Sequence, residues 1–111
     1  MAEYVELTID QGATYVNSIN VTDGNGNGLN LTGYLARSEM RKSYYSSTSY
    51  SFDLTFINSS NGSIQMYMSA ANTALLSSGR YVYDVELQDQ DGNVSRIFEG
   101  IVTVLPNVTK S

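Results

Sequence analysis

Residues 81–105, YVYDVELQDQDGNVSRIFEGIVTVL, decide the fold. Apolar and polar side chains alternate along 81–88 and along much of 94–105, which is the pattern of strands that bury one face. Between them, D-Q-D-G-N at 89–93 is a hairpin signal. The stretch therefore predicts two long antiparallel strands. Gly100 leaves a gap on the apolar face of the second strand, which indicates a bulge or a close neighbouring ring.

Shorter stretches upstream repeat the alternation, and turn signals separate them about every 8 to 12 residues. Only 69–78, S-A-A-N-T-A-L-L-S-S, is helix-like, with Ser69 as its cap and Leu75 or Leu76 packing down. These features predict an all-β fold, an antiparallel sandwich of about seven strands with a short helical turn near 70–77. The further strands are expected within 3–9, 14–22, 34–42, 52–56 and 64–68.

One domain accounts for the whole chain. Its 111 residues have the usual size of a single domain, and no linker or internal repeat divides them. We therefore expect residues 1–111 to form a single β-sandwich domain. The residues expected to point into its core are Ile19, Ala36, Leu54, Phe56, Ile64, Met66, Tyr83, Val85, Val102 and Val104.

The composition argues against several function classes. The chain has no Cys and no His, so disulfides, thiolate metal sites and the commonest general base are missing. The net charge of -5 repels phosphate backbones, so we expect no nucleic-acid partner. No run of 18 apolar residues and no secretory signal are present, so no membrane contact is expected. We interpret Asp84 and Glu86 as acidic residues on the solvent-exposed face of a strand. No G-x-S-x-G elbow occurs, so we expect no enzyme, no catalytic residue and no cofactor.

The motif D-G-N-G-N-G at 23–28 matches the first half of a calcium loop. Such a loop needs a bidentate Glu at its twelfth position, which is Tyr34 here. Residues 23–28 also suit a tight turn between strands. We therefore predict a connecting turn and no metal site. Asp89, Asp91 and Asn93 form a similar half-motif, for which we make the same prediction.

The stretch S-Y-Y-S-S-T-S-Y-S at 43–51 contains no aliphatic residue and is predicted to be a loop. Tyrosine supplies rigid contact area and serine supplies adaptable hydrogen bonds, a mixture that binding loops favour. A polar loop whose tyrosines fold back on the sandwich is an equally weighted alternative. The candidate interface residues are Tyr44, Tyr45 and Tyr50, with the basic residues Arg41 and Lys42 beside them.

Several segments resemble small structural proteins of bacteriophage virions, in the same order along most of the chain. The similar segments are I-D-Q-G-A-T-Y at 9–15, the D-x-x-G-N turn at 23–27, L-T-G-Y at 31–34, A-R at 36–37, G-R-Y-V-Y-D-V-E-L at 79–87 and F-E-G-I-V-T-V-L-P-N-V-T at 98–109. The resemblance implies an immunoglobulin-like sandwich and brings no active-site residues with it.

By this resemblance, the protein is localised in the virion, in the tail, baseplate or neck rather than as a capsid decoration. Its expected partners are other virion structural proteins, or itself as a homo-oligomer. The tyrosines leave one alternative open, a carbohydrate-binding or host-adhesion module that stacks them on sugars.

Overall fold

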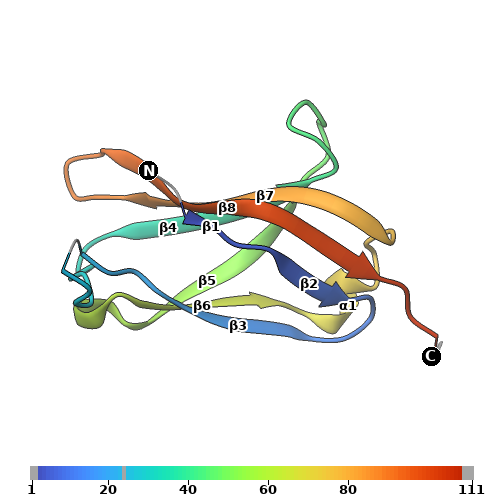
Figure 1. Cartoon of the computed structure of the whole chain (residues 1–111), viewed down its shortest axis with the longest axis horizontal. Helices are drawn as coiled ribbons and strands as arrows, with labels where there is room; N and C mark the ends of the chain where they lie inside the picture. Colours follow the sequence, from blue (N-terminus) through green and yellow to red (C-terminus); the bar gives the residue numbers. More distant parts are fainter. Residues whose placement is uncertain (1–2, 24, 109–111) are drawn as a thin grey trace.

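A computed structural model describes residues 3–23 and 25–108 of the protein (Figure 1). These residues form eight strands, a one-turn α-helix and a single 3-10 turn. The strands are β1 (Glu3–Tyr4), β2 (Leu7–Asp10), β3 (Tyr15–Asn20), β4 (Leu35–Arg41), β5 (Tyr50–Asn58), β6 (Ser63–Met68), β7 (Gly79–Gln88) and β8 (Val94–Leu105). The helix α1 is Ala70–Thr73, and the 3-10 turn η1 is Ser59–Asn61.

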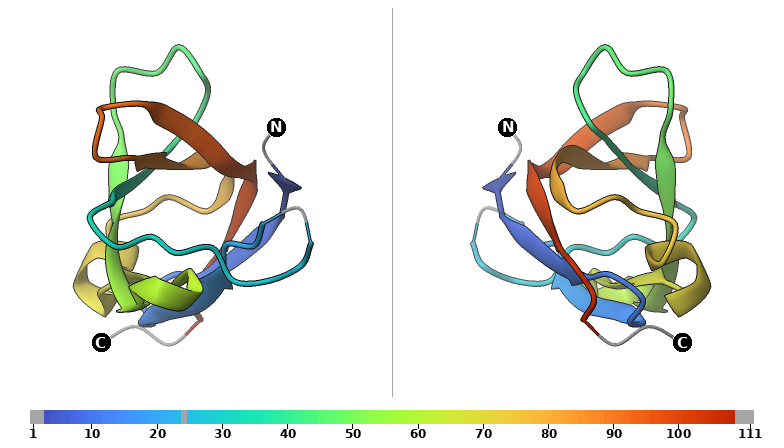
Figure 2. Two further views of the ribbon diagram at one scale, coloured as in Figure 1. Left: turned by 90° about the vertical axis from the view of Figure 1, so that its left-hand side faces the viewer. Right: turned by 90° about the vertical axis from the view of Figure 1, so that its right-hand side faces the viewer.

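The strands form one curled sheet in the order β1-β8-β7-β4-β5-β6-β3, with β2 also paired to β8. The sheet curls at β5, whose residues 50–52 pair with β4 and whose residues 53–58 pair with β6. β3 and β6 are thereby brought across from β7 and β8, as the end-on views show (Figure 2). The prediction of an all-β fold is confirmed.

The N-terminal strands differ from the prediction, because the sheet is mixed rather than purely antiparallel. The expected strand at 3–9 is divided into β1 and β2, and both run parallel to β8. The division occurs beside Gly100, where any side chain would collide with the carbonyl oxygen of Val5. The Tyr83 hydroxyl donates to the same oxygen at 2.6 Å. The predicted gap at Gly100 is therefore real, and a backbone carbonyl and the Tyr83 ring fill it.

The core lies inside the curl, and the predicted inward faces are confirmed. Six of the ten predicted core residues are buried, and the other four are partly buried and pack against them. Val85, Val102 and Ile64 have no exposed surface. The register of β7 with β8 shifts by one residue between Val85 and Glu86, where Ile97 of β8 is left without a partner. The buried six are Ile64, Met66, Tyr83, Val85, Val102 and Val104, and the partly buried four are Ile19, Ala36, Leu54 and Phe56.

The predicted helical turn is present and closes one end of the core. Ser69 caps it, since its hydroxyl accepts a hydrogen bond from the Asn72 amide at 3.2 Å. Leu76 is the residue that packs down, with 1% exposure, whereas Leu75 is 72% exposed. No helix among the described residues is long and apolar enough to cross a membrane.

Candidate functional site

The turn at 23–27 is built by the carboxylate of Asp23. One oxygen of this carboxylate accepts hydrogen bonds from the amides of Asn25 at 2.8 Å and Asn27 at 3.1 Å. Gly26 has a φ of 85°, a conformation that glycine adopts without strain. The prediction of a connecting turn is therefore confirmed for the described residues. Gly24, which belongs to the same motif, lies outside them.

The turn at 89–93 repeats this arrangement. The Asp89 carboxylate accepts from the amides of Asp91 at 2.9 Å and Asn93 at 2.8 Å, and Gly92 has a φ of 88°. The Asn93 backbone amide, followed by further hydrogen bonds, lowers the pKa of Asp89 below its ordinary value. Across the described residues, no group of three or more acidic side chains is placed to hold a metal ion. Both half-motifs are thus used to shape hairpin turns at the same end of the molecule (Figure 1).

The other candidate region is the connection between β4 and β5, which projects above the sheet, away from the two hairpin turns (Figure 1). This connection, residues 42–49, is called the tyrosine loop below. It is shorter than predicted, because Tyr50 and Ser51 belong to β5. Tyr50 pairs with Met40, and its ring packs edge-on against Tyr81 with 6.2 Å between the ring centroids. Packing against the core extends the strand into a stretch that has no aliphatic residues.

Lys42 is fixed at the same place. Its ammonium group lies 4.4 Å from the centroid of the Tyr81 ring, and it is 3.4 Å from the carbonyl oxygen of Ser78. The Tyr81 hydroxyl donates to the carbonyl oxygen of Ser77 at 2.9 Å. Tyr50, Lys42 and Tyr81 therefore form the foot of the tyrosine loop, which joins the loop to β7 and to the segment after α1.

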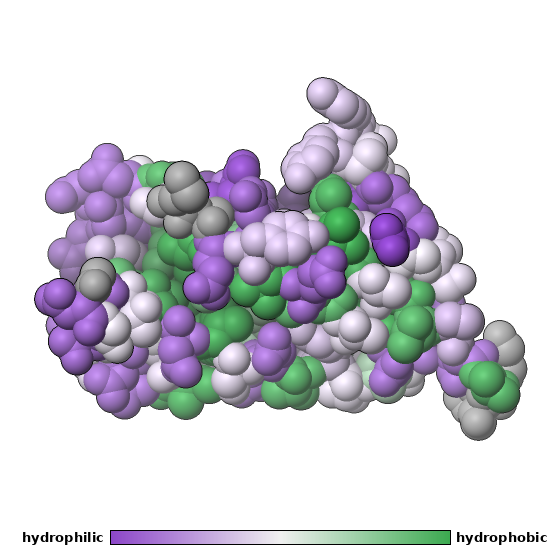
Figure 3. Space-filling view, in the orientation of Figure 1, coloured by the Kyte–Doolittle hydropathy of each residue, from purple (hydrophilic) through white to green (hydrophobic). Residues whose placement is uncertain are grey.

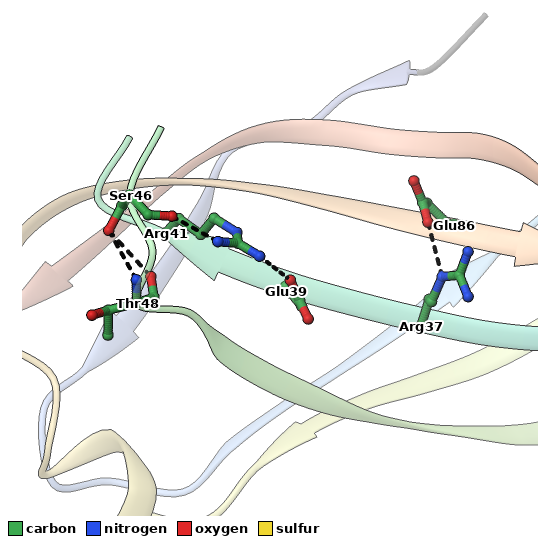
Figure 4. Close-up of polar contacts among 6 residues, drawn as sticks. All are labelled: Arg37, Glu39, Arg41, Ser46, Thr48 and Glu86. Carbon is green, nitrogen blue, oxygen red and sulfur yellow. Dashed lines mark hydrogen bonds and ion pairs between the residues drawn. The ribbon is translucent and has the colours of Figure 1, made fainter. Parts of the chain in front are cut away.

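Arg41 braces the loop from its outer side (Figure 4). One end of its guanidinium donates to the carbonyl oxygen of Ser46 at 2.7 Å, and the other contacts the Glu39 carboxylate at 2.9 Å. The Ser46 hydroxyl in turn accepts from the amide of Thr48 at 3.3 Å. Arg37, four residues before Arg41 on the same face of β4, pairs with Glu86 and does not reach the loop. The charge of Arg41 is therefore used to hold the loop in shape.

The tip of the loop carries Tyr44 and Tyr45. Tyr44 is 77% exposed and Tyr45 is 96% exposed. A turn closed by the Ser46 amide and the Ser43 carbonyl oxygen, 3.1 Å apart, presents both of them. In the space-filling view the projecting loop is pale, between the hydrophilic and hydrophobic extremes (Figure 3). The structure thus separates the five candidate residues, with Tyr44 and Tyr45 at the tip and the other three holding the base.

A hollow of about 160 Å³ lies beside Tyr44, on the outer face of β4, β7 and β8. Arg96 crosses it, 3.5 Å from Asp84 and 3.2 Å from Glu99. Burial, and then the charge of Glu86, raise the pKa of Asp84. The hollow is lined by Glu39, Arg41, Tyr44, Val82, Tyr83, Asp84, Arg96 and Glu99.

The hollow was not predicted, although the alternation of side chains did place Glu39 and Asp84 on the outward faces of their strands. Pairing of β4 with β7 sets these two residues opposite each other, and pairing of β7 with β8 adds Glu99 to the same row. Because a strand pattern does not reveal strand order, only the sheet topology could bring them together.

No protein-family model matches the chain, and no curated protein matches it. Among solved structures, an internalin-like protein of Listeria monocytogenes is similar at 20% identity and a TM-score of 0.47. The match covers 90% of this chain and 27% of that one, so the chain spans about a quarter of the length of the protein it matches.

Proposed function

We propose that the protein is a non-enzymatic structural subunit of a bacteriophage virion, which assembles through protein–protein contacts made by the tip of the tyrosine loop. The observation that carries the proposed contact is a pair of adjacent exposed tyrosines, Tyr44 and Tyr45, on a loop whose base is held in place. The virion itself is proposed from the resemblance of the segments at 9–15, 79–87 and 98–109. On that ground the tail, baseplate or neck is favoured over capsid decoration.

The energetics of binding favour such a tip. A tyrosine ring has few rotatable bonds, so burying it in a partner costs little conformational entropy, and its hydroxyl keeps a hydrogen bond. The brace from Arg41 to Ser46 limits the movement of the loop before any partner arrives. Binding then requires less ordering, which raises affinity without adding contacts. Central tyrosines of an interface are commonly worth about 2 kcal/mol or more each.

An immunoglobulin-like sandwich is the finer fold assignment in this proposal. In its support, β8, β7 and β4 form one layer with the N-terminal strands, and β3, β6 and the second half of β5 form another. Buried side chains from both layers meet in the core between them. The assignment accounts for loops at both ends of the molecule that can vary without disturbing the core.

The absence of an enzymatic role is likewise a proposal. Supporting it, the chain lacks His and Cys, and the arginines of the hollow are paired with its carboxylates. A general acid or base would instead need a group free to exchange protons with a substrate.

A carbohydrate-binding or host-adhesion role is the second candidate, and the hollow beside Tyr44 favours it. An exposed ring next to carboxylates and a guanidinium can stack on a sugar and hydrogen-bond its hydroxyls. A glycan array separates the two functions. Specific binding by the wild type that is lost in Tyr44→Ser supports adhesion, whereas no binding by either form supports the structural role.

Imaging of the particle tests the structural role. Phage particles from the source that encodes the chain are purified, and an antibody against the folded domain is located on them by electron microscopy. Regular labelling at the tail, baseplate or neck is the expected result. Particles that lack the chain by both labelling and mass spectrometry would overturn the proposal.

A further inference from the structure

The curled sheet has two free edges, and they differ in how well they are protected. One edge is formed by β1 and β2, which are only two and four residues long and are interrupted at Val5 and Glu6. Glu3, Glu6 and Asp10 add negative charge along it. Short, broken and charged edges resist pairing with other strands. The edge at β1 and β2 is therefore protected against pairing with other strands.

The other edge is β3, and it has none of these protections. Its six residues, Tyr15–Asn20, contain no charge and no proline. They pair with β6 in an unbroken register along their whole length. Val16 is 56% exposed, and the side chains of Ser18 and Asn20 are exposed as well. Within the described residues no strand covers the outer side of β3.

The register shows which backbone groups of β3 are free. The Val21 amide donates to the Gly62 carbonyl oxygen at 2.8 Å, just beyond the end of the strand. Because every second residue of an antiparallel pair is hydrogen-bonded to its neighbour, residues 15, 17 and 19 use their backbone groups on β6. The amides and carbonyls of Val16, Ser18 and Asn20 therefore point away from the sheet.

We propose that β3 is a self-association surface, at which the β3 strands of two copies of this protein pair antiparallel about a two-fold axis through Ser18. With this register Ser18 faces Ser18 of the second copy, and Val16 faces Asn20. Three facing pairs would form about six backbone hydrogen bonds, and the curled sheet would continue from one copy into the next.

Charge favours a second copy over a different partner strand. The chain has a net charge of -5, so two copies repel each other over most of their surface. A symmetric contact sets β3 against β3 of the second copy, so any charge on the strand would be repeated across the contact. An uncharged strand is therefore the edge that can self-pair without repulsion. A basic partner strand would instead be attracted to the acidic edge at β1 and β2.

The contact is small, so the pairing is weak in isolation. A six-residue edge buries less surface than a standard stable interface, and we expect a Kd between about 1 µM and 1 mM. Many copies held together in an assembly would strengthen it. The surface is separate from the tyrosine loop, and the proposal holds whether or not that loop binds a virion protein.

Sedimentation equilibrium of the purified protein over a range of concentrations tests the proposal. The wild type should form dimers, and Ser18→Lys should weaken dimerisation about tenfold or more, because two ammonium groups then face each other. Thr55→Lys is the matched control. Thr55 lies in the same row of the sheet, two strands inward, and is also exposed. It should dimerise like the wild type.

A mixture of two variants tests whether the strand that pairs with β3 is β3 of a second copy. Ser18→Lys mixed with Ser18→Glu should form mixed dimers, because opposite charges then face each other across the two-fold axis. Tyr44→Ser with Tyr45→Ser should leave dimerisation unchanged, which separates this surface from the tyrosine loop. The proposal is overturned if the wild type stays monomeric up to about 1 mM, if both lysine variants behave alike, or if the mixture does not recover pairing.

Discussion

The foot and the tip of the tyrosine loop use the same residue type for opposite purposes. At the foot, the rings of Tyr50 and Tyr81 meet edge-on beneath the Lys42 ammonium, and Tyr81 is only 2% exposed. At the tip, most of Tyr44 and nearly all of Tyr45 are in solvent. A ring at the foot therefore contributes to the stability of the fold, whereas a ring at the tip is available to a partner.

The largest expected effect is that of Tyr81→Ala at the foot. Removing a buried ring leaves a cavity under β5, and we expect the free energy of unfolding to fall by about 3–5 kcal/mol. Tyr45→Ala, the matched change at the tip, should alter it by less than about 0.5 kcal/mol. Urea unfolding of both variants measures the difference.

Tyr81→Phe keeps the ring and removes only the hydroxyl that donates to Ser77, so it should cost about 1 kcal/mol. Tyr81→Phe can still be measured if Tyr81→Ala does not fold. Similar losses for Tyr81→Phe and Tyr45→Ala would contradict the distinction between foot and tip.

Arg41→Ala should lower the free energy of unfolding less than Tyr81→Ala does, and its main effect should be on the order of the tyrosine loop. The brace to Ser46 disappears, so the amides of Ser46 and Thr48 should exchange hydrogen with solvent several-fold faster. The free energy of unfolding should fall by about 1 kcal/mol or less, because the guanidinium is partly exposed.

Arg37→Ala is the control for this variant, since Arg37 lies on the same face of β4 and pairs with Glu86 without touching the loop. Hydrogen exchange followed by NMR compares the two. If both variants loosen the loop equally, the brace is not what holds it.

A still smaller effect is expected in the hollow beside the tip, where the pKa of Asp84 is raised by burial and by Glu86. A raised carboxyl pKa means that folding disfavours the charged form, so the cost to stability is present above the folded pKa. This cost is relieved as the pH falls through that value. Asp84→Asn should therefore raise the melting temperature at pH 7. This gain should shrink as the pH falls toward the ordinary pKa of Asp.

Thermal unfolding between pH 3 and pH 7 measures this dependence, on the order of a few degrees at most. Asp53→Asn, at an exposed position of β5, is the control and should show no such gain. A gain for Asp84→Asn that grows as the pH falls would show that the sign of the effect is wrong.

We expect calcium to have no effect at the two hairpin turns, at 23–27 and 89–93. The Asp23 and Asp89 carboxylates are already engaged by backbone amides, so a cation would have to displace these hydrogen bonds. Calorimetry should detect no binding below about millimolar calcium. Micromolar binding would mean that these turns are metal sites.

Much of the fold was predictable from the sequence, because alternation reports directly on which side chains face the core. The inward positions of β7 and β8, the cap at Ser69 and both D-x-x-G-N turns follow from local chemistry. The parallel pairing of β1 and β2 with β8 did not, since it depends on the fit of the Val5 carbonyl beside Gly100.

The candidate site was only partly predictable. Composition identified the exposed tyrosines Tyr44 and Tyr45, but it could not separate them from Tyr50, whose partner Tyr81 is 31 positions away in the chain. Nor could it show that Arg41 and Lys42 are occupied within the protein. Long-range contacts decided the role of each of these residues, and a local pattern contains no information about them.

The most direct test of the proposed contact is a competition for places on the particle. Wild type and the Tyr44→Ser, Tyr45→Ser double variant are produced together during infection, and mass spectrometry measures their ratio in purified particles against their ratio in the lysate. We predict a melting temperature within a few degrees of the wild type and at least a tenfold depletion of the variant in particles. Each place on the particle selects between the two forms by their binding free energies, and interface tyrosines are commonly worth about 2 kcal/mol or more each. Equal ratios in particles and lysate would contradict the account, and would leave the loop as a spacer with the contact elsewhere on the sheet.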